Sequence, residues 1–180
     1  MAERSASWSQ GVFGEFAVPL SKLIPECIGR AHERARDGHR EVGTQTLEAY
    51  GHGLHASQYE ELAAGLADLP GATAVRLQAR TVMVVAGQVL LRADLIRRHG
   101  PEPLQGELDL GLEELQEQEF HKDLSQLDPD VGLVLLAYAC AMDTGVMRLE
   151  WGDAELRRGD RHLLWHHHEP LELPDARRSA

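Results

Sequence analysis

Apolar residues recur at helical spacing in a stretch near the N-terminus. The stripe consists of Ile24, Cys27, Ile28, Ala31 and Ala35. Residues at this spacing lie on one face of an α-helix. Pro25 suits the first turn of such a helix, and Gly38 suits its C-terminal end. We therefore predict a helix from about residue 24 to residue 38.

A second helical stripe follows a glycine-rich segment, "GHGLH", at residues 51–55. Ser57 followed by Glu60 has the spacing of a capping box, which marks a helix N-terminus. Apolar positions then repeat at helical spacing as far as Leu66, and Pro70 with Gly71 closes the element. We predict a helix that begins at Ser57 and ends before Pro70.

The next segments have the pattern of strands. Three short apolar runs are separated by polar or turn residues, with a tight turn at residues 86–88. A continuous apolar run at 131–140 is typical of a central strand buried on both faces. Two further runs predict a hairpin. The expected strands are 74–78, 81–86, 88–95, 131–140, 146–156 and 162–168.

Between the third and fourth strands the chain is acidic and helical in pattern. Residues 107–130 carry nine acids and the single base Lys122. The complete order is then helix, helix, three strands, helix, three strands. We predict a single α+β (or α/β) domain with a mixed, mostly antiparallel sheet of five to six strands and two to three helices packed on it.

The 180 residues are enough for one domain with a substantial core. Residues 1–18 are rich in serine and glycine, and we expect a flexible N-terminal arm whose aromatic residues dock on the protein's own body or on a partner. The domain then covers residues 19–173, and residues 174–180 form a disordered tail.

The middle of this order, helix–meander–helix–strand, resembles the restriction-endonuclease-like core. Such a nuclease needs an acid at its second strand and an acid-x-lysine on the third, which hold a divalent metal. Here the second strand reads "TVMVVA", and Asp94 in the third is followed by Leu95 and Ile96. The resemblance therefore implies a degenerate domain without catalytic residues.

The net charge of −11 disfavours nucleic acid and anionic membranes as partners. The most basic stretch runs from Arg30 to Arg40 and is diluted by acids, as in a solvated helix face. The longest apolar run, residues 131–142, is too short to span a bilayer. Cys27 and Cys140 lie in apolar runs as buried thiols, and no signal peptide is apparent, which indicates a cytoplasmic protein.

The stretch "HLLWHHHEP" at residues 162–170 contains the strongest candidate for chemistry. Strand alternation places His166 and His168 on one face, where two imidazoles can bind zinc or another divalent metal. Glu150 or Asp153 across the hairpin would complete the ligand sphere. The alternatives are an exposed strand end without a task and a cluster of imidazoles that lower one another's pKa.

His52 and His55 form a second candidate site. They precede the predicted N-terminus of a helix, where backbone amides can bind an anion. The alternative is a flexible connector in which glycine only permits a turn.

No phosphate-binding loop, nucleophile elbow, dinucleotide fingerprint or C-x-x-C motif is present. We therefore expect a non-catalytic binding or regulatory protein without a cofactor, which acts through a protein partner or as a homo-oligomer. Its expected contact residues are Glu113, Glu114 and Glu117 in the acidic helix and Trp8 and Phe13 in the arm. A metal-dependent hydrolase that uses the histidine-rich strand end is the alternative.

Overall fold

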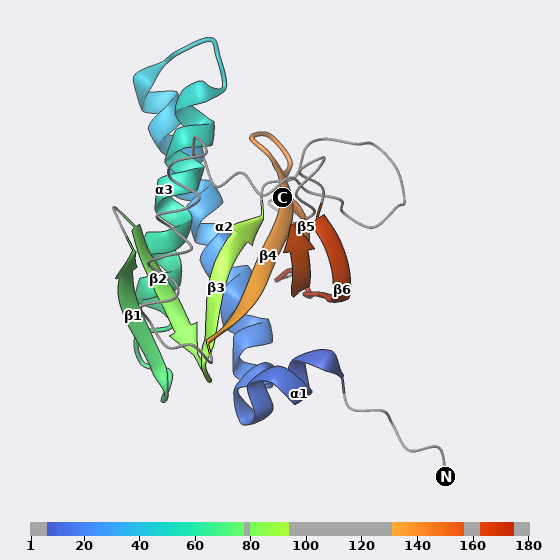
Figure 1. Ribbon diagram of the computed structural model, residues 1–180. Coiled ribbons are helices and arrows are strands. Elements are labelled where there is room, and N and C mark those ends of the chain that lie inside the picture. The colour runs from blue at the N-terminus through green and yellow to red at the C-terminus, as the bar shows by residue number, and fades with distance from the viewer. Residues whose placement is uncertain (1–6, 78–79, 94–130, 157–162, 175–180) are drawn as a thin grey trace.

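The computed structural model is an α+β fold in which two long helices cover one face of a six-stranded sheet (Figure 1). It describes residues 7–77, 80–93, 131–156 and 163–174. The helical elements are α1 (Trp8–Phe13), the 3-10 helix η1 (Gly14–Phe16), α2 (Ala17–Val42) and α3 (Glu48–Gly65). The strands are β1 (Ala72–Leu77), β2 (Arg80–Val85), β3 (Gln88–Ala93), β4 (Gly132–Ala141), β5 (Gly145–Leu156) and β6 (Leu163–Pro170).

The strands lie in the sheet in the order in which they occur along the chain. Neighbouring strands are antiparallel except β3 and β4, which are parallel. The predicted fold class, with a mixed and mostly antiparallel sheet, is confirmed. All six predicted strands are present within a few residues of their expected bounds, and β5 pairs with β6 as the predicted hairpin. The acidic helix expected at 107–130 lies outside the described residues.

The predicted tight turn joins β2 to β3. Val85 pairs with Gln88, so the loop has two residues, Ala86 at φ 51° and Gly87 at φ 74°. Two successive positive φ values give the twist that a two-residue hairpin needs. Only Ala86 carries the steric cost of this conformation, because glycine has no Cβ.

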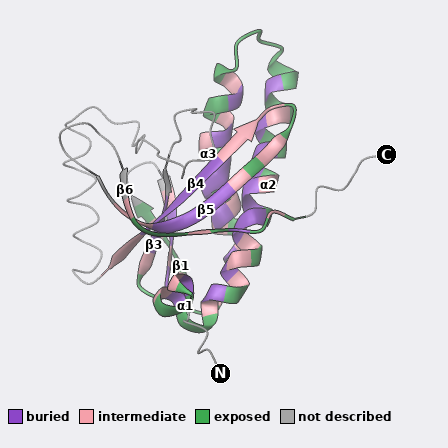
Figure 2. Cartoon of the chain, turned by 90° about the vertical axis from the view of Figure 1, so that its right-hand side faces the viewer, coloured by how far each residue is buried: buried purple, intermediate pink, exposed green. Residues whose placement is uncertain are grey.

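The face of the sheet that contacts the helices is called here the helix face, and the opposite one the far face (Figure 2). Side chains of β4 alternate between them. Val134, Leu136 and Tyr138 belong to the core on the helix face, whereas Leu135 and Ala137 belong to a second cluster on the far face. All five are buried, which confirms that residues 131–140 form a central strand buried on both sides.

Helix α2 is longer than its apolar stripe predicted. It begins at Ala17 and ends at Val42, where Gly43 adopts φ 68° and its N–H bonds to the His39 carbonyl. Pro25 therefore lies inside the helix rather than in its first turn, and Gly38 is not the C-cap. Burial of the stripe outweighs the lost hydrogen bond at the proline, because most helical stability in proteins comes from tertiary packing.

Helix α3 also begins earlier than predicted. It starts at Glu48, so Ser57 and Glu60 lie in its interior and form no capping box. Gly51 and Gly53 do not interrupt it. Gly53 faces α2, where its added Cβ would lie 3.5 Å from the Cα of Ala35. Packing between the two helices therefore offsets the low helix propensity of glycine.

The two helices touch closely at the end remote from their connecting turn. A Cβ at Gly65 would overlap the Sγ of Cys27 and lie 2.8 Å from Nη2 of Arg30. Cys27 is fully buried there, and its burial raises the thiol pKa, although Arg30 beside it acts in the opposite direction. The absence of a side chain at Gly65 is thus a condition for this helix contact.

Residues 8–18 are not a flexible arm. Trp8 to Phe13 form a helical turn capped by Ser7, and Phe13 is 2% exposed. Its ring stacks on Trp151 of β5 at 5.1 Å between centroids, and Trp8 packs edge-on against both. The expectation that the aromatics dock on the protein's own body is correct, and this docking gives the segment its fixed helical structure.

No helix in the described part of the chain is both long and apolar enough to cross a membrane.

Replacing Val134 with aspartate is expected to unfold the protein. Val134 is 1% exposed on the helix face, so an aspartate there is an unpaired buried charge. We expect a loss of unfolding free energy on the order of 3–5 kcal/mol. Chemical denaturation followed by circular dichroism measures it. Val18→Asp is the matched control, since Val18 is 56% exposed. A Val134→Asp variant as stable as wild type would contradict the core assignment.

Candidate functional site

The histidine-rich strand contains a β-bulge that the alternation pattern did not predict. Asp153 pairs with His167 and Ala154 pairs with Trp165, so the bulge inserts His166 as one extra residue in β6. Beyond the bulge His168 pairs with Gly152, and both lie on the far face with Trp165. The strict alternation across residues 162–169 is therefore wrong, because the bulge moves Trp165 to the face of His168.

The four residues expected to bind a metal are divided between the two faces. Glu150 pairs with Ala137 on the far face, whereas Asp153 follows Trp151 on the helix face. Asp153 contacts His167 through Nδ1 at 3.1 Å, in an exposed position. His166, His167 and His168 are all exposed. Among the described residues, no three His, Cys, Asp or Glu side chains are close enough to hold a metal ion.

The carboxylate of Glu150 is already bound by Arg148. It is 4% exposed, and its Oε1 accepts from the Nε of Arg148 at 2.8 Å. Its Oε2 is buried and has no hydrogen-bond partner in the described structure. Loss of Arg148 would leave the buried carboxylate of Glu150 without its partner, which is strongly destabilising.

His52 and His55 do not precede a helix N-terminus. Both lie inside α3, where the backbone amides are used by the helix itself. His52 is exposed, and His55 packs edge-on against Tyr59 at 5.9 Å between ring centroids. The backbone amides that an anion site requires are therefore not available beside them.

The expected partner-binding residues have different outcomes. Phe13 is part of the protein's own core and Trp8 packs against it. Glu113, Glu114 and Glu117 lie outside the described residues.

Each arginine of the basic stretch in α2 is close to a carboxylate. Arg30 contacts Glu61 at 2.9 Å, and Arg34 contacts Glu60 at 2.6 Å. Arg36 and Arg40 approach Asp37 at 3.4 and 3.8 Å. Exposed ion pairs of this kind contribute little stability. They nevertheless neutralise the positive charge of the arginines, which a phosphate group would need for binding.

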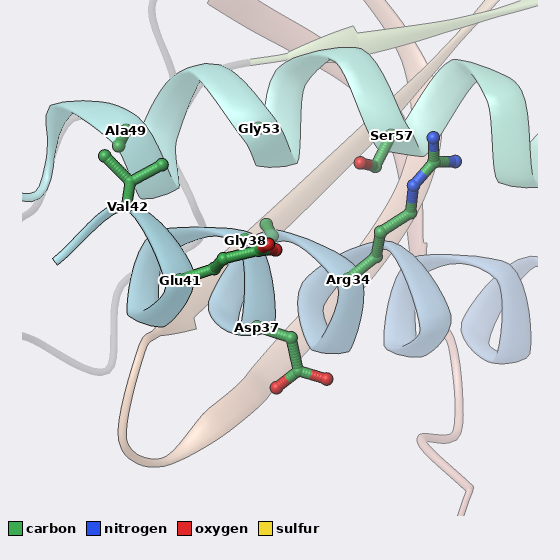
Figure 3. Close-up of a pocket in the computed structure, with 9 residues that line it drawn as sticks. Arg34, Asp37, Gly38, Glu41, Val42, Ala49, Gly53 and Ser57 are labelled. Atoms are coloured by element: carbon green, nitrogen blue, oxygen red, sulfur yellow. The ribbon is translucent and has the colours of Figure 1, made fainter.

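A concave feature of the described structure lies between α2 and α3 near the tip of their hairpin (Figure 3). This groove has a volume of about 560 Å³. It is lined by Arg34, Ala35, Asp37, Gly38, Glu41, Val42, Ala49, Gly53 and Ser57. The floor consists of small residues, and the charged side chains come from α2. We take it as the candidate functional site.

The groove exists because the helix surfaces that face each other carry few side-chain atoms. Ala35 and Gly38 on α2 are three residues apart, and Ala49 and Gly53 on α3 are four apart, so each pair lies on one helix face. The sequence patterns did not predict this site. Its only signal is small residues at helical spacing on two adjacent helices, and that signal required both helix bounds to be correct.

The opposite side of the helix pair contains buried polar contacts. His32 Nδ1 lies 2.8 Å from the Tyr50 hydroxyl, and Tyr138 donates its hydroxyl proton to Oε1 of Gln58. Burial lowers the pKa of His32, and the nearby charge of Arg36 acts in the same direction. The neutral form of the imidazole is therefore favoured. The two contacts join α2 to α3 and α3 to β4 inside the core.

Comparisons of the chain with models of protein families, with curated proteins and with solved structures find no match. A function must therefore be argued from the geometry of this chain alone.

Replacing both His166 and His168 with alanine is expected to leave stability almost unchanged. Both side chains are exposed, and exposed substitutions usually change the unfolding free energy by less than about 0.5 kcal/mol. The melting temperature of the purified untagged protein, with and without a chelator, is the measurement. A chelator effect that the double variant abolishes would establish a metal site instead.

Stability is expected to fall as the pH decreases below about 6.5, the ordinary pKa of histidine. Folding lowers the pKa of His32, so the unfolded chain takes up a proton that the folded chain resists. One such proton contributes at most about 1.4 kcal/mol per pH unit. Urea unfolding at pH 7.5 and 5.5 measures the slope. His32→Gln should reduce it, whereas His52→Gln, at an exposed position, should not. Equal slopes in wild type and His32→Gln would refute the assignment.

Proposed function

We propose that the protein is a non-catalytic cytoplasmic binding protein that acts through protein–protein contacts. The α2–α3 hairpin tip is its contact surface. The observation that carries this proposal is the open groove between α2 and α3, next to two exposed apolar side chains. Val42 is 63% exposed at the end of α2, and Leu47 is 47% exposed just before α3. Exposed apolar residues beside a concave surface are common at contact sites.

The shape of the groove supports a peptide or protein segment as its occupant. Small-molecule sites usually enclose the ligand and bury most of its surface. This groove is open along its length between two helices and has charged residues on one side (Figure 3). A groove between helices is one of the recurrent surfaces on which segments of other proteins bind.

The remaining candidates have less support. A hydrolase that uses His166 and His168 would need Asp153, which lies on the helix face, or Glu150, which is buried and bound by Arg148. Nucleic-acid binding through Arg30 to Arg40 would require those arginines to give up their carboxylate contacts, against a net charge of −11. The reducing cytoplasm is a suitable compartment for the free thiols of Cys27 and Cys140.

Photo-cross-linking tests the proposed surface. A benzophenone amino acid at position 42 should cross-link to a protein in extracts of the source cells, because Val42 borders the groove. The same amino acid at position 18 is the control, since Val18 is a comparably exposed valine at the other end of α2. Products are separated by mass and identified by peptide sequencing.

A product specific to position 42 supports the proposal, and one with twice the mass of 19.9 kDa identifies a second copy of this chain as the partner. No product at position 42, or equal products at 42 and 18, would rule out the hairpin tip as the contact surface.

A further inference from the structure

We propose that the groove between α2 and α3 accepts a cationic side chain, lysine or arginine, from a segment of the partner protein. This inference rests on the proposed function and adds the chemistry of the partner. It depends on three features of the groove: a carboxylate without a cation, a neutralised arginine and a floor of small residues.

Glu41 supplies the carboxylate. It is exposed, and no cationic side chain among the described residues lies within ion-pair distance of it. Figure 3 shows its side chain lying along α2 at Gly38, whereas Asp37 points away from α3. Asp37 already shares the two arginines at 3.4 and 3.8 Å. Glu41 is therefore the negative group of the groove that remains available to a ligand.

Arg34, the one base among the described residues that line the groove, is already paired. Arg34 contacts Glu60 at 2.6 Å and Glu61 at 3.7 Å, both on α3. The charge that an incoming group meets is therefore negative. The chain as a whole carries −11, so a cationic segment is also attracted over a longer distance.

The floor admits the stem of a long cationic side chain. A Cβ added at Gly38 would meet no atom within 4 Å, so the space above it is open. Val42 and Ala49 lie at the end near the connecting turn and offer apolar surface (Figure 3). Lysine and arginine bury their methylene groups along such surface while the charged head stays near water or a carboxylate.

A phage-displayed library of random dodecapeptides, selected on the immobilised full-length protein, is the probe. Selected peptides should share a lysine or arginine, flanked by small residues. The best of them is then synthesised with a fluorescent label, and its affinity is measured by anisotropy against wild type and four variants. The variants are Gly38→Phe, Gly51→Phe, Glu41→Gln and Glu26→Gln.

A Cβ at Gly38 would meet no atom within 4 Å, so Gly38→Phe should place its ring in the groove and abolish binding. Gly51→Phe is its control, because Gly51 is also helical and open but does not line the groove. Glu41→Gln should weaken binding about tenfold and reduce its salt dependence, since it removes the charge that attracts the cation. Glu26→Gln removes the same charge from an exposed position elsewhere on α2 and should have no effect.

Selected peptides without a basic residue, equal binding by wild type and Glu41→Gln, or no selected peptide at all would overturn the inference. Such a failure is distinguishable from failure of the proposed function. A cross-link at position 42 with no basic peptide preference leaves the hairpin tip as a contact surface and excludes only its cationic occupant.

Discussion

The close approach of α2 and α3 at Cys27 and Gly65 is the constraint on which most of the structure depends. The Sγ of Cys27 lies so close to Gly65 that a Cβ there would overlap it. The side chain of Cys27 on α2 therefore packs directly against the backbone of α3. This contact sets the spacing along the whole pair. It brings Arg30 and Arg34 within reach of Glu61 and Glu60, and it places Tyr50 against His32. Nearer the connecting turn, the facing residues of α2 and α3 are also small. No long side chain fills the space between the helices there, and the groove remains open.

The strands were predictable because burial and strand periodicity agree in them. Residues 131–140 are apolar at every position, and β4 is buried on both faces as that pattern requires. The turn at Ala86 and Gly87 follows from its short length between two apolar runs. The helix bounds were not predictable to the same degree, because Pro25, Gly38, Gly51 and Gly53 are local signals against a helix. Tertiary packing of α2 and α3 outweighs them, and a single sequence does not contain that information in local form.

The histidine-rich strand shows a different limit of sequence reasoning. Its hairpin with β5 was expected, yet one extra residue at His166 changes which side chains share a face. Gly152 is part of the reason. A Cβ there would overlap the carbonyl oxygen of His167 and lie 2.9 Å from both the Cα of His168 and the Trp165 ring. Strand β6 therefore passes very close to Gly152 of β5. The pairing register of β5 with β6 differs by one residue on the two sides of the bulge. Ligand sets inferred from alternation do not survive such a shift.

The arrangement of the aromatic residues favours the hairpin tip over the N-terminal segment as the proposed contact surface. Trp8 and Phe13 pack against each other and against Trp151, so their rings contact the protein's own fold. At the opposite end of α2, Val42 is exposed, and so is Leu47 just before α3. Alanine at position 38 would favour the helix by about 1 kcal/mol relative to glycine, and its Cβ would meet no atom within 4 Å. A larger side chain would also occupy the groove. Position 38 therefore favours a larger residue for the stability of α2 but glycine for access to Glu41.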